Sequence, residues 1–131
     1  MDPNQNGIAT VSSPFSFRDT VNRLKAFIVG RGLYLFAHVD HEAGAHRAGL
    51  EMNPACLLIF GSAKAGTPAM VMRPLLAFDL PLKVLVWQDV KRQVWVSYNT
   101  PEFLAQRHDV PPEVMKPISG LPMLVKAALA A

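Results

Sequence analysis

Hydrophobic and polar residues alternate along this chain with two different periods, one typical of helices and one typical of strands. Between residues 16 and 30 the apolar positions recur every three or four residues, which predicts a helix with one buried face. Ser16 is suited to cap the N-terminus of this helix, and Gly30 and Gly32 end it. The apolar stripe consists of Phe17, Val21, Leu24 and Ile28.

Short apolar runs predict the strands. Residues 33–39 are mainly apolar and aromatic, and after two glycine breaks they predict a well-buried strand. A second apolar run begins at about residue 55. Residues 82–87 and 93–98 predict a hairpin, because β-branched and aromatic residues lie on both sides of a charged turn. Residues 8–11 indicate a short edge strand.

Capping residues predict further helices. Asp40 is placed to cap a short helix over residues 41–48. Thr100, which is followed by a proline, begins a helix that ends near His108. The alanine-rich, apolar residues 121–131 predict a closing helix that is docked on the rest of the domain, because its surface is too apolar to face water.

The order of these elements favours an α+β fold. Helices are interspersed with strands, and the clearest strand pair is antiparallel, so we expect a two-layer domain. Its sheet would be mixed but mainly antiparallel, with about five strands and with helices packed on it. The chain length suits one domain over residues 1–131, with residues 1–7 as a frayed tail.

Composition adds a prediction about assembly. Of the 131 residues, 50% are hydrophobic and 18% are charged, which predicts a folded domain with a real core. A domain of this size has a limited interior, so we expect part of the apolar surface to be buried against a second copy in a homodimer. Cys56 is the one cysteine and lies in an apolar run, where it is expected to be a small core residue.

Charge and hydropathy limit the classes of partner that the sequence predicts. The net charge of +3 comes from basic residues that are scattered along the chain, without the clustered stripe that nucleic-acid binding requires. The first residues do not have the pattern of a signal peptide, and no apolar stretch approaches the roughly 20 residues that span a bilayer. The sequence therefore predicts a cytoplasmic protein that binds neither nucleic acid nor membrane.

The turn from Gly61 to Thr67 follows an apolar strand and leads into a helix. Its spacing is close to that of the phosphate-binding P-loop, but Thr67 stands where that loop requires lysine, which argues against nucleotide hydrolysis. With Thr67 as N-cap and Pro68 at the first helical position, free backbone N–H groups and the Lys64 ammonium would attract an anion. The alternative is a capped turn whose glycines serve only the bend.

Other polar residues extend this hypothesis. His41 and Lys83 are candidates to line the same anion site; a Lys83 amine that pointed inward would have a lowered pKa, whereas on the solvent face it would be an ordinary lysine. The predicted ligand-binding set is Gly61, Ser62, Lys64, Gly66, Thr67, His41 and Lys83.

The histidines suggest two further chemistries. His38, Asp40 and His41 are close in sequence and are weak candidates for metal ligands, but the spacings of zinc sites are absent, so we expect no metal or other cofactor. His41 is the candidate catalytic residue for an enzyme in which it acts as a general acid or base near Ser62 or Thr67.

Several of these segments together resemble a known family. They are Gly32-Leu33 before an aromatic strand, Asp40-His41 after it, Leu58-Ile59-Phe60-Gly61 with Lys64 and Gly66-Thr67, Asp79-Leu80-Pro81-Leu82-Lys83, and the hairpin from Trp87 to Tyr98. In this order, over about residues 16–108, they resemble the bacterial family catalogued as domain of unknown function 302. That pattern usually reads Phe-Gly-Asn-Pro-Lys at the turn, where this chain has Ser62 and Ala63. The resemblance implies a small α+β fold, often dimeric, without an established reaction.

Three functional hypotheses follow from the sequence. The first is a homodimeric protein that binds a small anionic ligand at the turn from Gly61 to Thr67. The second is an enzyme that uses His41. The third is a protein-interaction module without a ligand site.

Overall fold

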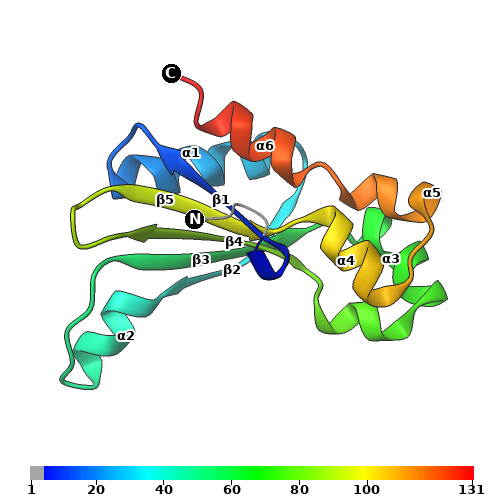
Figure 1. The fold of residues 1–131 in the computed structure, drawn as a ribbon, viewed down its shortest axis with the longest axis horizontal. Helices are drawn as coiled ribbons and strands as arrows, with labels where there is room; N and C mark the ends of the chain where they lie inside the picture. Colours follow the sequence, from blue (N-terminus) through cyan, green and yellow to red (C-terminus); the bar gives the residue numbers. More distant parts are fainter. Residues whose placement is uncertain (1–4) are drawn as a thin grey trace.

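A computed structural model describes residues 5–131 of the chain, and these residues form one antiparallel sheet with helices packed against it (Figure 1). The strands are β1 (Ile8–Ser13), β2 (Tyr34–Asp40), β3 (Ala55–Gly61), β4 (Leu82–Gln88) and β5 (Val94–Asn99). Their order across the five-stranded sheet is β1-β5-β4-β3-β2, and every neighbouring pair is antiparallel. The α+β prediction is confirmed, with a fully antiparallel sheet in place of a mixed one.

The helices occupy one face and the two ends of this sheet. They are α1 (Phe17–Gly30), α2 (His41–Arg47), α3 (Ala63–Met72), α4 (Pro101–His108), α5 (Pro112–Met115) and α6 (Leu121–Ala128), with the 3₁₀ turns η1 (Gln5–Gly7), η2 (Pro74–Phe78) and η3 (Lys116–Ile118). Figure 1 shows α1 and α6 along one face of the sheet. It also shows α2 at one end of the sheet and α3, α4 and α5 gathered at the other end.

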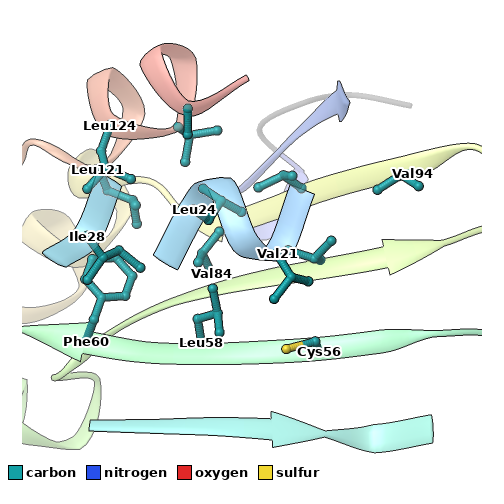
Figure 2. Packing of buried hydrophobic residues seen from close by; sticks show 14 residues of the cluster. Val21, Leu24, Ile28, Cys56, Leu58, Phe60, Val84, Val94, Leu121 and Leu124 are labelled. Atoms are coloured by element: carbon teal, nitrogen blue, oxygen red, sulfur yellow. The ribbon is translucent and has the colours of Figure 1, made fainter. Parts of the chain in front are cut away.

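The larger hydrophobic core lies between the sheet and the pair α1 and α6 (Figure 2). Leu24 and Ile28 of α1 are fully buried against Leu58 of β3 and its neighbours, which confirms the apolar stripe as the face that packs on the sheet. Leu124 of α6 completes this core, so the closing helix is docked as expected. Cys56 is 1% exposed and belongs to the same core. We call this set the sheet core.

A second, smaller hydrophobic cluster lies at the end of the sheet where α3, α4 and α5 meet. Its members are Ala69, Leu76, Leu104, Val110, Met115 and Ile118. We call this set the end cluster. Leu82 of β4 packs against both the end cluster and the sheet core, so the two separate clusters are adjacent to each other.

Side-chain caps begin three helices as the sequence predicts. Ser16 Oγ accepts the N–H of Asp19 at 3.1 Å, and Asp40 Oδ1 accepts the N–H of Ala43 at 2.9 Å. Thr100 acts in the same way at the start of α4. Each cap satisfies a backbone donor that the first turn of a helix leaves free, which is why these boundaries are readable from the sequence.

The predicted hairpin is confirmed as β4 and β5, and its turn is held by Asp89. One carboxylate oxygen of Asp89 accepts the N–H groups of Lys91 and Gln93, and the other accepts Nε1 of Trp95, all at 2.9 Å. The hydrogen bond from Trp95 is the main reason that the pKa of Asp89 is lowered. Trp87 is stacked on Trp95 across the hairpin, with 6.2 Å between the ring centroids.

Two expectations need correction. The strand after the first helix is not well buried: β2 lies at an edge of the sheet, and its Tyr34, Phe36 and Val39 side chains are 66%, 51% and 37% exposed. Apolar composition alone does not reveal whether a strand is central or at an edge. The predicted frayed tail is also too long, because the Gly7 carbonyl accepts the N–H of Thr100 at 2.8 Å; residues 1–4 lie outside the described residues.

Within residues 5–131 there is no helix whose length and apolar character would let it cross a membrane.

Candidate ligand pocket

A pocket of about 330 Å³ lies where the sheet core meets the end cluster. From the sheet core it takes Phe60, Leu121 and Leu124, and from the residues of the end cluster it takes Ile118. The remaining walls come from the start of α3, from the segment that precedes β4, and from the end of α1. Four separate parts of the chain therefore enclose one mainly apolar space.

Small residues after β3 leave room for this pocket. Gly61, Ala63, Ala65 and Gly66 all line it. The glycines with positive φ in the described chain are elsewhere, so neither Gly61 nor Gly66 is needed for an unusual backbone angle. A Cβ on Gly66 would lie 3.4 Å from Leu80 Cδ1, an ordinary contact, and a longer side chain there would extend among the pocket walls. These glycines therefore provide space.

The helix that follows β3 begins earlier than the sequence suggested. Ser62 is the N-cap of α3, with extended backbone angles and with Oγ accepting the N–H of Ala65 at 3.2 Å. The expectation that Thr67 caps the helix is therefore wrong, and Pro68 lies inside α3. The Asn-Pro pair of the family pattern corresponds to Ser62 and Ala63, which are the N-cap and the first helical position. Both Asn and Ser are favoured caps, so the substitution preserves the turn.

The turn divides into residues that line the pocket and residues that do not. Gly61, Ser62 and Gly66 line it. Lys64 and Thr67 are exposed on α3 and are not among the lining residues. The ammonium that the sequence offered as the positive charge of the site is therefore outside it.

His41 lies far from this turn. It begins α2, directly after Asp40, which pairs with Cys56, whereas Gly61 at the other end of β3 pairs with Tyr34. At about 3.4 Å per residue, Cys56 and Gly61 are about 17 Å apart. Figure 1 shows α2 and α3 at opposite ends of the sheet. The structure therefore does not bring His41 together with Ser62 or Thr67.

The histidines near β2 do not gather into a metal site. Within residues 5–131, no group of three His, Cys, Asp or Glu side chains is placed to hold a metal ion. His38 lies opposite Leu58 on the neighbouring strand, and burial, followed by the positive charge of Lys25, lowers its pKa. Asp40 uses its side chain as the helix cap described above.

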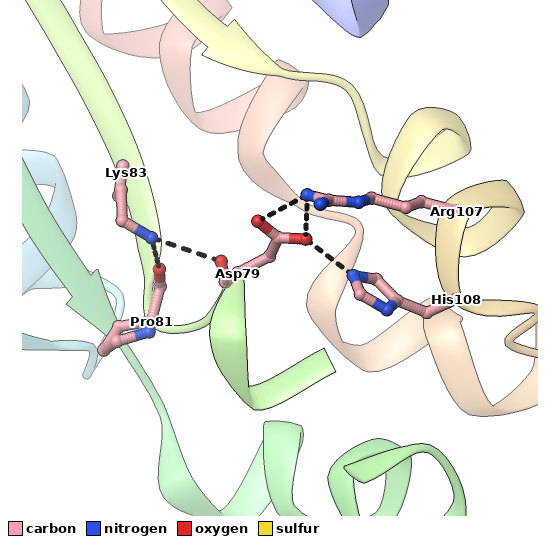
Figure 3. Close-up of polar contacts among 5 residues, drawn as sticks. All are labelled: Asp79, Pro81, Lys83, Arg107 and His108. Atoms are coloured by element: carbon pink, nitrogen blue, oxygen red, sulfur yellow. Dashed lines mark hydrogen bonds and ion pairs between the residues drawn. The ribbon is translucent and has the colours of Figure 1, made fainter. Parts of the chain in front are cut away.

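Lys83 has a structural role at the start of β4. Its Nζ donates to the carbonyl oxygens of Pro81 at 3.0 Å and of Asp79 at 3.3 Å (Figure 3). It is not among the residues that line the pocket. Instead, it holds the chain segment that carries the lining residues Leu80 and Pro81.

The Asp79 carboxylate fixes the same segment from its other side (Figure 3). It accepts Nη1 of Arg107 at 2.9 and 3.1 Å and Nε2 of His108 at 2.6 Å. The side chains of Asp79 and His108 are 14% and 8% exposed. The sequence gave no sign of this cluster, because Asp79 and His108 are 29 residues apart.

Arg31 is the charged residue of the pocket lining, and the sequence did not single it out. It follows α1 as the C-cap residue, and its side chain is exposed. The ion pairs of the described residues involve other cations, namely His46, Arg73, Arg107 and His108. Its backbone position beside a glycine break is ordinary for a helix end, so only the folded structure reveals its place at the pocket.

A small α+β domain with an apolar pocket at one end of its sheet is the class that this fold and site define. The chain belongs to the family described as "Domain of unknown function DUF302", whose profile matches residues 9–127. The fold resembles the crystal structure of an uncharacterized conserved DUF302 protein from Bacillus stearothermophilus, with a TM-score of 0.78 over 94% of this chain and 95% of that one. The two sequences are 17% identical, so this likeness concerns the fold.

Two relatives are similar at the level of sequence. Over 105 residues, or 80% of this chain, it is 40% identical to proteins named Fluoride-specific ion channel FluC 1 in Brucella suis biovar 1 (strain 1330) and in Brucella abortus biovar 1 (strain 9-941). The match covers 41% and 39% of those proteins. The chain thus spans about two fifths of the length of these curated relatives.

Proposed function

We propose that this protein binds a small, largely apolar ligand in the pocket beside Gly61 and Ser62. The observation that carries the proposal is the pocket itself, which has a volume of about 330 Å³ and is walled mainly by aliphatic and aromatic side chains. Ligand sites are typically concave and mostly apolar, with a few polar groups that orient the ligand. Ser62 and Arg31 are such polar groups at this pocket.

The way in which the walls are fixed supports a preformed site. The segment before β4 is held at two points. Arg107 and His108 bind the side chain of its Asp79, and Lys83 donates to the carbonyl group of its Pro81. Because this segment supplies Leu80 and Pro81 to the lining, its position sets the width of the pocket. A fixed wall lowers the entropy that binding would otherwise cost.

Filling the pocket by substitution tests this proposal. Gly66→Leu places a branched side chain among the pocket walls, whereas Gly66→Ala adds only a Cβ with ordinary contacts and serves as the matched control. We expect octanoate or 1-octanol to shift amide resonances of pocket residues in wild type and in Gly66→Ala. The same probes should leave the spectrum of Gly66→Leu unchanged.

The stability of each variant must be checked alongside binding. Gly66→Ala should raise the free energy of unfolding by up to about 1 kcal/mol, because alanine has the higher helix propensity. If Gly66→Leu does not fold, Ala65→Leu serves the same purpose, since Ala65 also lines the pocket. Binding that persists unchanged in a folded, filled variant would contradict the proposal.

Homodimerisation remains a prediction. It is supported by the edge strand β2, which leaves one row of backbone groups unpaired and exposes Tyr34, Phe36 and Val39. A second copy would cover these apolar side chains by a two-fold interface. Gel filtration with light scattering should give twice the mass of the chain at micromolar concentration, and a monomer there would contradict the prediction.

A second candidate function is association with a membrane channel. Its support is the similarity of this chain to part of two Brucella proteins named as fluoride-specific channels. Fluoride itself is a poor fit to the pocket, because a small buried anion needs several donors and this lining is mainly apolar. We therefore propose a contact with the channel rather than fluoride binding.

Co-elution tests the second candidate. The purified chain is mixed with the part of the Brucella suis protein outside the matched region, prepared in detergent. We expect the two to elute together in gel filtration, and separate elution would contradict the association. Sodium fluoride should not change the midpoint of thermal unfolding more than sodium chloride does.

A further inference from the structure

We infer that the ligand of this pocket is an amphipathic monoanion, such as a medium-chain carboxylate, with its charged end at Arg31 and its apolar part inside. This inference rests on the ligand-binding role proposed above and names the chemistry of the ligand. It follows from the distribution of charge around the pocket, from the surroundings of Arg31 and from the volume available.

The charge in the pocket lining is of one sign, positive. Among residues 5–131, Arg31 is the charged residue of the pocket lining, and these residues contribute no carboxylate to it. Other lining residues, such as Phe60, Leu124 and Ile118, are apolar and buried. A ligand with one anionic end and an apolar body would match both parts, whereas a cation would meet Arg31 without a compensating acid.

Arg31 is also available for a ligand. Among residues 5–131, the guanidinium of Arg31 takes no part in the ion pairs, and no side-chain hydrogen bond involves it. By contrast, Arg73 and Arg107 are each bound to a carboxylate, and Arg23 donates to the carbonyl groups of Ala128 and Ala130. The planar guanidinium suits a carboxylate, which it can bind through two parallel hydrogen bonds.

The volume limits the length of the ligand. A group the size of a water molecule takes about 30 Å³, so about 330 Å³ accommodates roughly eleven such groups. This corresponds to a carboxylate with a chain of about eight or nine carbons. Each methylene that enters the pocket should increase affinity about fourfold, and the gain should stop when the pocket is full.

The experiment is a calorimetric titration of the purified chain with linear carboxylates from butanoate to dodecanoate. We expect affinity to rise about fourfold per methylene and to level off near octanoate or nonanoate. Octanoate should bind more tightly than 1-octanol, and octylammonium should bind most weakly. The preference for octanoate over 1-octanol should shrink as the salt concentration rises.

Substitution of the arginine then tests its role. Arg31→Gln should weaken octanoate binding about fivefold, near the upper limit for an exposed ion pair, and leave 1-octanol binding unchanged. Arg18→Gln is the matched control, because it removes one charge from an exposed position of the same helix, away from the pocket. Its effect on octanoate binding should be small.

The outcomes separate this inference from the proposed function. Equal affinity for octanoate and 1-octanol, or an equal loss in Arg31→Gln and Arg18→Gln, would overturn the anionic ligand and leave the apolar pocket standing. Failure of all these probes to bind, or binding that Gly66→Leu does not reduce, would overturn the ligand-binding role itself. An affinity that keeps rising up to dodecanoate, without levelling off, would overturn the assignment of the alkyl chain to this pocket.

Discussion

The sheet core and the end cluster are built from different parts of the chain and from different kinds of element. The sheet core joins the strands to α1 and α6 through fully buried side chains such as Leu24 and Leu58 (Figure 2). The end cluster joins short helices and turns around Leu76 and Leu104. The pocket lies at the boundary between them.

This difference explains where a ligand site is available. Regular strands and long helices pack their side chains into one another and leave no space for a ligand. The short elements of the end cluster are joined by prolines and glycines, and their positions are fixed by polar contacts such as that between Asp79 and His108. Space is left where the two packing arrangements meet, and the small residues of α3 keep it open.

The largest effect should come from removing a buried leucine from each cluster. Leu24→Ala and Leu76→Ala each delete a side chain that is 0% exposed, so each should lower the free energy of unfolding by about 3–4 kcal/mol. We expect urea unfolding to remain a single transition in both variants, because a domain of this size unfolds cooperatively. A Leu76→Ala variant with an unchanged urea midpoint would show that the end cluster unfolds separately.

High pH should destabilise the sheet core through Cys56. Burial raises the pKa of this thiol from 9.0 to about 11. Because the folded protein holds the proton more tightly than the unfolded chain, the contribution to stability is complete below pH 9 and is lost as the pH rises to about 11. The loss should reach about 2–3 kcal/mol.

Urea unfolding of wild type and Cys56→Ala from pH 8 to pH 11 measures this contribution. Burial also raises the pKa of Tyr98, which adds a loss of the same sign, so the difference between the two proteins isolates the thiol. Parallel pH profiles for the two proteins would contradict the prediction.

The polar cluster beside the pocket should contribute less than the leucines. Asp79→Ala leaves the buried His108 without its acceptor and should lower the free energy of unfolding by about 2 kcal/mol. Arg107→Ala removes a partner whose side chain is 51% exposed, so its effect should stay below about 1 kcal/mol. Equal losses of free energy of unfolding in the two variants would show that the contact between Asp79 and His108 is not the main contribution of this cluster to stability.

A similarly small effect should come from the cap of α3. Ser62→Ala removes the acceptor of the Ala65 N–H and should cost about 1 kcal/mol in urea unfolding. Ser62→Asn, which restores the residue of the family pattern, should leave the free energy of unfolding nearly unchanged because asparagine is an equally good cap. A loss of the same size in both variants would mean that the cap does not decide the stability of this turn.

Local signals made much of the fold predictable. The caps Ser16, Asp40 and Thr100 were identified correctly because each acts on a backbone group three residues away. The apolar spacing of α1 and the hairpin of β4 and β5 were also confirmed. The prediction of Thr67 as the cap of α3 was wrong. Both Ser62 and Thr67 have a hydroxyl group that could cap a helix, and the residue at which β3 ends decides that Ser62 is the cap.

The candidate site was located only in part. Gly61, Ser62 and Gly66 line the pocket, whereas the other predicted residues do not, and ligand binding at this turn stays a prediction. Lys64 was the wrong cation for this pocket, because a helix carries successive side chains around its axis and this one faces water. Arg31 lines the pocket instead, thirty residues before Gly61 in the chain.

The sequence by itself determined the α+β class and most of the helices and strands, because caps, apolar periods and turn residues act over a few residues. It also determined that the turn after β3 is lined by small residues. Only the tertiary structure decided that β2 is an edge strand, that Asp79 meets His108, and that Arg31 meets the pocket. These relations join residues that are distant along the chain, and they exist only once the sheet order and the docking of α6 bring them together.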